Sequence, residues 1–405
     1  MDLSFYNNFS TSLAAQEAQI NTLQQQISTG MKVQNASQNP AAYETAALGN
    51  DQISQLTNDT TTQAAIQTQL GAANDAYSSV TSLLDNVQSI VVQALNGTTS
   101  SQNRNALATQ VQSASQQLLS IGNTVAPNGS YLFGGSRGTL APFQIDSNGN
   151  IAYFGDAGQG QASISPGETA NTLVTGEVFT SALSGDGTTS VTANSSNTGS
   201  GEIIQQGLVN ANTANAFQHG NSPITVSFAV SGTTTTYTAS QGGSTISTGT
   251  LNSNGTNQTS VQLAGVNYDI TGSPANGDSF TIAPSRPQSV FSLLKQISTA
   301  LGDTNATPAQ TAKTNQVLNQ SLAGLAQYQQ AVTTAQAQNG VTLQALSTAT
   351  TGNTSQKTAV QTTVNQAIAV DMPTAITALD QTMTAVQAAM KAFSTAQGLS
   401  LFQYL

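Results

Sequence analysis

The chain has 405 residues, of which only 6% are charged, against roughly 25% in an average soluble protein. Its formal net charge is −10 and its eight Lys and Arg residues are scattered, which argues against nucleic acid as a partner because nucleic acid is bound by clustered basic side chains. It contains no Cys, so disulfides, thiol nucleophiles and thiolate metal sites are excluded.

The sequence shows no sign of a targeting or membrane segment. The first thirty residues lack both the basic leader and the continuous apolar core of a signal peptide. No run of about 18 apolar residues occurs that could cross a bilayer. We therefore expect no membrane partner and, if the protein works outside the cell, export by a route that needs no cleaved signal peptide.

The first helix is expected from about Asn7 to Ser28. This stretch is almost entirely Gln, Ser, Thr, Asn and Ala, with a thin apolar stripe whose spacing places its members on one face of a helix. Thr29-Gly30 is a suitable end, because Gly accepts the left-handed conformation at a helix C-terminus. The stripe consists of Phe9, Leu13, Ile20, Leu23 and Ile27.

Two further helices are expected before residue 125. Asn39-Pro40 is a start signal, since Asn caps a helix and Pro fits its first position, and the helical pattern then continues to about Leu95. At 1.5 Å per residue this helix is roughly 80 Å long, too long for the core of a small domain. Another helix is expected from about Ser101 to Thr124.

From residue 143 to 282 the apolar period falls to two, and Gly, Ser, Thr and Asn dominate. This pattern indicates β-structure. Asn148-Gly149 and Asn254-Gly255 are signals for tight hairpins, and a short helix over 202–210 is weakly indicated. We predict an all-β insert of about eight to ten strands.

Helical spacing returns after residue 287, with helices expected over about 290–301, 308–348 and 354–395. The last helix carries a second narrow apolar stripe. Such a stripe cannot close a globular core alone, but it can pack against another, as in a coiled coil. We therefore expect the two ends of the chain to pair with each other or with neighbouring copies, and for 1–30 and 375–405 we favour burial between subunits. The C-terminal residues expected in this assembly interface are Ile376, Leu379, Met383, Val386, Met390, Phe393, Leu399, Leu401, Phe402 and Leu405.

These elements predict a multidomain α+β fold. The termini, residues 1–140 and 285–405, would form a long α-helical coiled-coil or bundle rod, and an all-β outer domain, residues 141–284, would be inserted in the middle. The arrangement suits a self-assembling subunit of a tubular polymer. An interdomain hinge is expected where the insert begins and ends, at Gly134, Gly135, Pro284 and Pro287.

Four runs of sequence carry a family resemblance. They are Gln24–Ala42 (QQQISTGMKVQNASQNPAA), Asn128–Phe143 (NGSYLFGGSRGTLAPF), Ile270–Ile282 and the tail Leu399–Leu405. The first resembles the N-terminal signature of the family of bacterial flagellins and flagellar hook-associated proteins, and the others are similar to its hook-associated branch. The resemblance covers most of the chain, and the β insert is its loosest part.

The resemblance implies a structural subunit of the bacterial flagellum, with no enzymatic activity and no cofactor or metal. It implies export through the flagellar type III apparatus, with an export chaperone as a partner. It further implies a role in motility at the junction between hook and filament, as a self-associated ring above hook-associated protein 1 and beneath the first flagellin. One alternative is a divergent flagellin that forms the filament itself, although the tail differs from the usual flagellin ending. Another is a secreted adhesive or carbohydrate-active protein, which the few aromatic residues of the insert disfavour.

One position departs from the family pattern. The family normally has acidic residues just before the proline that starts the second helix, where this chain has Gln38 and Asn39. We expect Asn39 still to cap that helix, so that the turn survives.

Three motifs could suggest other chemistry. Residues 146–150 begin like a calcium loop but lack the Gly and Glu that such a loop requires, so a hairpin turn is expected. Residues 134–138 are rich in glycine but lack the Lys-Ser/Thr of a phosphate loop. His219, the only histidine, is expected to lie in a loop.

Overall fold

The chain, seen in a computed structural model, divides into two compact units. One unit joins the two ends of the chain, residues 1–62 and 348–405, and the other comprises residues 63–347. Two long helices, α2 (Pro40–Leu95) and α6 (Pro308–Ile368), contribute to both units. The structure describes residues 3–97, 99–220, 222–251, 258–303 and 307–402.

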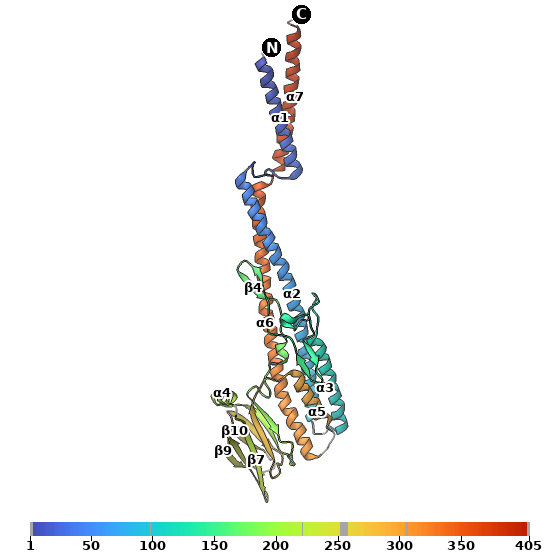
Figure 1. Cartoon of the computed structure of the whole chain (residues 1–405), viewed down its shortest axis with the longest axis vertical. Helices are drawn as coiled ribbons and strands as arrows, with labels where there is room; N and C mark the ends of the chain where they lie inside the picture. Colours follow the sequence, from blue (N-terminus) through green and yellow to red (C-terminus); the bar gives the residue numbers. More distant parts are fainter. Residues whose placement is uncertain (1–2, 98, 221, 252–257, 304–306, 403–405) are drawn as a thin grey trace. The chain divides into compact units, whose positions relative to one another are not determined.

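The N-terminal helices lie where the sequence predicts them. They are α1 (Leu3–Thr29), α2, and α3 (Ser101–Gly122) (Figure 1). The α1 helix ends at Gly30, whose φ of +71° favours glycine. Asn39 Oδ1 accepts a hydrogen bond from the amide of Ala42 at 3.1 Å, so it caps α2 as expected.

The C-terminal helices are α5 (Val290–Gly302), α6 and α7 (Met372–Phe402). The predicted break at 349–353 is wrong, because α6 continues through these residues and ends only at Ile368. Pro373 explains the true position of the break, since proline is tolerated only in the first turn of a helix. The Asp371 carboxylate accepts a hydrogen bond from the amide of Thr374 at 3.3 Å there.

Within residues 63–347, α3 packs along α5 (Figure 1). Val111 and Leu118 of α3 and Ile297 of α5 are completely buried, and each such side chain contributes about 1.5–3 kcal/mol. The ring centroid of Phe143, at the start of the β region, lies 5.3 Å from that of Phe291 on α5. This aromatic contact fixes the beginning of the β region to the helices.

The described part of the β region contains twelve strands, more than predicted. Two isolated hairpins come first, β1 (Phe143–Ile145) with β2 (Ile151–Tyr153) and β3 (Gln161–Ser165) with β4 (Glu168–Asn171). The turn predicted at Asn148-Gly149 connects β1 and β2, with Gly149 at φ +71°. The sequence at 146–150 is therefore a hairpin turn, as expected.

The remaining strands form two antiparallel sheets. A five-stranded sheet has the order β5-β12-β7-β8-β9, and a three-stranded sheet has the order β10-β11-β6. A short helix, α4 (Ala211–His219), follows β6. The strands are β5 (Thr189–Ala193), β6 (Glu202–Leu208), β7 (Ile224–Ser231), β8 (Thr234–Gln241), β9 (Ser244–Thr250), β10 (Thr259–Leu263), β11 (Val266–Thr271) and β12 (Ser279–Pro284).

Two local expectations differ from the structure. The segment 202–210 is mostly strand β6, and the helix begins only after Asn210, whose side chain accepts a hydrogen bond from the amide of Thr213 at 3.1 Å. Pairing with β11 overrides the weak helical pattern of β6. The turn predicted at Asn254-Gly255 lies outside the described residues, and the strands on either side of it, β9 and β10, belong to different sheets.

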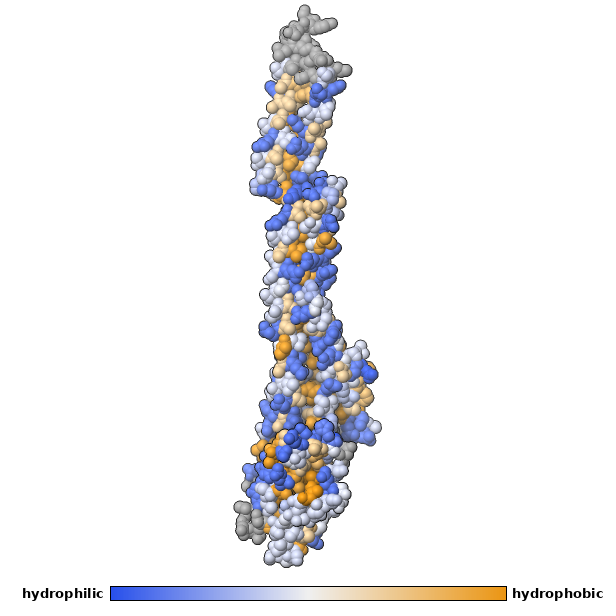
Figure 2. Space-filling model, turned by 90° about the vertical axis from the view of Figure 1, so that its left-hand side faces the viewer, coloured by the Kyte–Doolittle hydropathy of each residue, from blue (hydrophilic) through white to orange (hydrophobic). Residues whose placement is uncertain are grey.

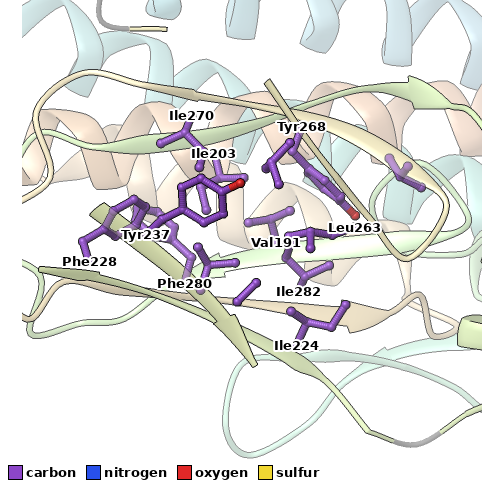
Figure 3. Close-up of a cluster of buried hydrophobic side chains, with 14 of the residues drawn as sticks. Val191, Ile203, Ile224, Phe228, Tyr237, Leu263, Tyr268, Ile270, Phe280 and Ile282 are labelled. Carbon is purple, nitrogen blue, oxygen red and sulfur yellow. The ribbon is translucent and has the colours of Figure 1, made fainter. Parts of the chain in front are cut away.

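The two sheets enclose one apolar core, to which Ile203 and Tyr268 come from one sheet and Phe280 and Ile282 from the other (Figure 3). Phe228 meets Phe280 edge to face, with ring centroids 6.0 Å apart. Burial raises the pKa of the Tyr268 hydroxyl. Helices at both ends of the chain and a β region inserted between them confirm the predicted α+β fold class.

Candidate assembly interface

The helices α1 and α7 pack against each other as an antiparallel pair, with both chain ends on the same side (Figure 1). Near the termini the rings of Phe9 and Phe393 stack, with centroids 4.2 Å apart and planes 7° from parallel. The ring of Tyr6 lies 6.0 Å from that of Phe393. Such aromatic pairs contribute about 0.5–1.5 kcal/mol beyond the area that they bury. The two ends of the chain therefore pair within one molecule.

The facing sides of the two helices follow a heptad spacing, with steps of three and four residues. This spacing is typical of a coiled-coil seam. The five residues predicted on α1 all lie in this seam, as do three of those predicted on α7. The seam consists of Phe9, Leu13, Gln16, Ile20, Leu23 and Ile27 of α1 and Ala375, Leu379, Thr382, Val386, Ala389 and Phe393 of α7, each partly or fully buried.

Gln16 is a long polar residue in this apolar seam. Its Oε1 atom is buried and accepts no hydrogen bond from the described residues. A buried acceptor without a partner costs about 1–3 kcal/mol. A polar residue at a core position of a coiled coil specifies register and the number of partners, so Gln16 is suited to fixing how this seam aligns.

A second apolar stripe on α7 is left uncovered by the described residues. Ile376, Met383 and Met390 are 46%, 41% and 48% exposed. They lie seven residues apart, about 80° around the helix from the seam. Figure 2 shows tan and orange residues along the visible side of the terminal helices, flanked by blue polar ones. The sequence analysis had treated the seam residues and the exposed residues of α7 as a single stripe. Of the remaining predicted residues, Leu399, Leu401 and Phe402 are on α7 with side chains outside the described part, and Leu405 lies outside it entirely.

The break between α1 and α2 lies beside the break between α6 and α7. The amide of Lys32 donates to the carbonyl of Ile368 at 2.7 Å, and the amide of Val370 donates to the carbonyl of Gly30 at 3.0 Å. The break between α1 and α2 and the break between α6 and α7 therefore lie next to each other, and the two connecting segments are hydrogen-bonded to each other.

Glutamine side chains hold the loop between α1 and α2. Gln38 Oε1 accepts hydrogen bonds from the amides of Gln34 at 2.6 Å and Asn35 at 3.4 Å. The amide group of Gln34 donates to Thr29 Oγ1 at 2.7 Å. Gln38 is therefore a neutral acceptor within this loop, and with Asn39 capping α2 the turn is preserved as expected.

Gly134 and Gly135 lie in a tight turn that Asp156 closes. Gly135 has φ +62°, and a Cβ there would lie 2.4 Å from the carbonyl oxygen of Asp156. Hydrogen bonds from the hydroxyl and the amide of Ser136, the latter at 2.7 Å, lower the pKa of the Asp156 carboxyl. Only glycine fits at Gly135 without movement of this loop.

The segment that leads from the β region back to the helices, residues 284–287, also pairs with earlier parts of the β region. Pro284 is the last residue of β12 and lies opposite Thr189 of β5. Pro287 forms a bridge with Leu183. The role of these two prolines, and of the two glycines, as an interdomain hinge stays a prediction.

Side-chain amides of α6 attach this helix to the β region, a contact that sequence reasoning missed. Gln316 Oε1 accepts from the amide of Ile203 and Gln316 Nε2 donates to the Ile203 carbonyl, both at 2.8 Å. Gln320 Oε1 accepts from the amide of Val191 at 3.1 Å. Ile203 and Val191 lie on the edge strands β6 and β5, so these amides occupy sheet edges that would otherwise be unpaired. Gln327 Nε2 donates to the carbonyl of Asp186 at 3.0 Å in the same way. The available signal in the sequence was the spacing of Gln316, Gln320 and Gln327, which places them on one side of the helix.

The described residues offer no site for a metal ion. No group of three or more His, Cys, Asp or Glu within them could hold a metal ion. None of their helices has the length and apolar character needed to cross a membrane. His219 ends α4, rather than lying in a loop, and its Nδ1 is 2.7 Å from the carbonyl of Asn215.

The described chain thus combines terminal helices that pair through a heptad seam with a β region inserted between them. The comparisons with known proteins agree. Residues 2–137 match the family described as the bacterial flagellin N-terminal helical region. The chain is similar to flagellar hook-associated protein 3 over part of its length, and the resemblance expected from the sequence is confirmed.

The individual matches differ in extent. The chain is 33% identical over 133 residues to flagellar hook-associated protein 3 of Escherichia coli K12, a match that covers 33% of this chain and 41% of that protein. FlgL of Xanthomonas campestris is 27% identical with a TM-score of 0.69, covering 78% of this chain and 99% of the solved one. The flagellar junction protein FlgL of Legionella pneumophila shares the fold at 23% identity, with a TM-score of 0.69 over 80% of this chain and 100% of that one. The match to the Escherichia coli protein spans less than half the length of that relative.

Proposed function

We propose that this chain is a structural subunit of the bacterial flagellum that forms the junction between hook and filament. The observation that carries the proposal is the incomplete burial of α7, whose seam is closed by α1 while Ile376, Met383 and Met390 remain exposed. An apolar line along a narrow helical pair is suited to a neighbouring helix of another copy. The names of the relatives, a hook-associated protein and a junction protein, support this role.

The exposed stripe supplies a driving force for assembly. Full burial of a Met or Ile side chain is worth about 1.5–3 kcal/mol, so covering the exposed half of each of these residues gives about 1 kcal/mol. Repeated around a ring, with the residues of the seam holding each pair rigid, this gain favours self-association. In this proposal the seam holds α1 and α7 together within one molecule, and the exposed stripe contacts neighbouring copies.

The proposal includes partners, location and domain roles. The subunits form a ring above hook-associated protein 1 and below the first flagellin, at the extracellular flagellum. They reach it through type III export with a chaperone and without a cleaved signal peptide. The protein is not an enzyme. Residues 1–140 and 285–405 form the helical part of the assembly, residues 141–284 form its outer domain, and the hinge lies at 134–135 and 284–287.

Immunogold labelling of isolated flagella, with antibody against the β region, tests the location. A single band where hook meets filament is expected. Label along the whole filament would instead favour a divergent flagellin. Flagella without label would contradict both functions.

A charge placed on the exposed stripe tests the interface. Met383→Asp should abolish incorporation into flagella, because it puts a carboxylate into an apolar contact, while the seam and the β region stay folded. Thr384→Asp is the matched control, since Thr384 is exposed on α7 and lies outside both the stripe and the seam. Leu23→Asp and Leu379→Asp should also prevent assembly, in their case by opening the seam. Normal incorporation of the Met383 variant would refute the assignment of the stripe.

A further inference from the structure

The five-stranded sheet of the β region has one covered edge and one open edge. At the covered edge, Gln320 of α6 accepts a hydrogen bond from the backbone of β5. The opposite edge is β9, on the side of the sheet away from α6 (Figure 1). No other described strand pairs with the outer side of β9, and five of its seven residues are exposed. Because β9 shares no residue with the terminal helices, a contact made there is independent of the proposed function.

The hydrogen bonds to β8 show which backbone groups of β9 face outward. The amide of Leu251, directly after β9, donates to the carbonyl of Thr235 on β8 at 2.8 Å. Successive residues of an antiparallel strand direct their N–H and C=O groups to alternate sides, so Gly249 also faces β8 while Thr248 and Thr250 face outward. Within the described residues, no hydrogen bond reaches the outward backbone groups of these two threonines.

The outer side of β9 lacks the features that usually prevent a further strand from being added. Natural edge strands are protected by charged side chains, by Pro, by short length or by a bulge. The sequence of β9, STISTGT, contains no charge and no Pro. Its bulge lies opposite Ala239 and Ser240, and residues 247–250 pair with β8 in regular register. The C-terminal half of β9 is therefore a regular and unprotected edge.

The distribution of charge favours a second copy of this chain as the occupant of the edge. Residues 203–268, which include β7, β8, β9 and β10, contain no Asp, Glu, Lys or Arg. Since each chain has a net charge of −10, copies repel each other where their acidic surfaces meet, but two β9 strands approach without bringing like charges together. The strand also suits itself, because Thr side chains opposite each other stabilise an antiparallel pair.

We propose that β9 pairs with β9 of a second copy, as antiparallel strands related by a two-fold axis. The pairing that uses both outward residues places Thr248 opposite Thr250 of the second copy, with Gly249 at the axis. The outward amides and carbonyls of the two threonines then bond across the axis, and the two sheets become one. Such a contact uses the same surface on both copies and closes as a dimer. It is small, so association is weak and depends on protein concentration.

Cysteine cross-linking of the full chain tests the register, because the natural sequence contains no Cys. Thr248→Cys mixed with Thr250→Cys should form a mixed covalent dimer under mild oxidation. Thr236→Cys is the control, since Thr236 is exposed on β8, one strand in from the edge, and it should stay monomeric. All variants also carry Met383→Asp, which removes the contact proposed for the exposed stripe of α7.

Sedimentation velocity over a series of concentrations tests the edge itself in the same Met383→Asp protein. Thr248→Pro removes the outward amide but none of the bonds to β8, and should lower the association constant at least about tenfold because both copies lose a donor. Thr248→Val keeps the amide and should associate normally. Unchanged hydrogen exchange of β7 would show that the sheet of the Pro variant is folded.

The possible results separate this proposal from the function proposed above. A dimer that persists with Met383→Asp, weakens with Thr248→Pro and gives the mixed cross-link supports pairing through β9. Association that Met383→Asp alone abolishes would overturn this pairing and support the stripe instead. Equal effects of Thr248→Pro and Thr248→Val, or no mixed cross-link, would also overturn it.

Discussion

Gln316 should hold the β region to α6, and its replacement by leucine is the sharpest test of this contact. The side chain is 2% exposed and makes both hydrogen bonds to the backbone of Ile203, which is itself buried. Gln316→Leu conserves most of the volume but leaves one buried amide and one buried carbonyl without partners. Each such group costs about 1–3 kcal/mol, so for the two groups we expect a loss of about 2–6 kcal/mol.

Hydrogen exchange measures this loss at the strand concerned. Since every 1.4 kcal/mol is a factor of ten, the amide of Ile203 and its neighbours on β6 should exchange at least about 30-fold faster. Asn319→Leu is the control on the same helix, because the side chain of Asn319 is only partly buried and makes no hydrogen bond within the described residues, so this change should affect β6 little. Unchanged protection of β6 in the Gln316 variant would refute the idea that amides of α6 secure the sheet edge.

Two further predictions concern buried polar groups. Gln16→Leu should stabilise the α1–α7 pair by about 1–2 kcal/mol, because it removes a buried acceptor without a partner. Slower exchange of the backbone amides of α1 would show this stabilisation. Faster exchange would mean that the side-chain oxygen of Gln16 does have a hydrogen-bond donor. Burial raises the pKa of Glu202, beside Asn315 at 3.0 Å, so the stability that it contributes is present at low pH and lost as pH rises through the raised pKa. Glu202→Gln should therefore increase stability at neutral pH and flatten the pH dependence of urea unfolding, and an unchanged pH dependence would contradict the assignment.

Local signals in the sequence predicted most of the residues at which the helices begin and end. The glycine after α1 and the Asn39 cap act within one turn, so they predict boundaries directly. The break at 349–353 failed because its Thr, Gly and Asn residues are tolerated inside a packed helix, where Asn353 is only 1% exposed. Tertiary burial there outweighs the low helix propensity of these residues.

Two features could not be predicted from the sequence pattern. They are the pairing of the strands and the division of the apolar residues of α7 between the seam and the exposed stripe. The pairing of β6 with β11 joins segments some sixty residues apart, and alternation within one strand does not identify its partner. On α7, Leu379 and Met383 are both apolar and one turn apart, yet one lies in the seam and the other is exposed. Only the position of α1 separates the two stripes.

The paired breaks near Gly30 and Val370 have a mechanical consequence. A helix interrupted by a single linker can swivel and twist freely, whereas here two linkers cross the gap together and are tied by the bonds from Lys32 and Val370. Two tethers side by side resist torsion and share tension, but they still allow bending about the axis that runs through both. If the terminal helices assemble as proposed, this double connection lets them transmit torque while still bending at the break.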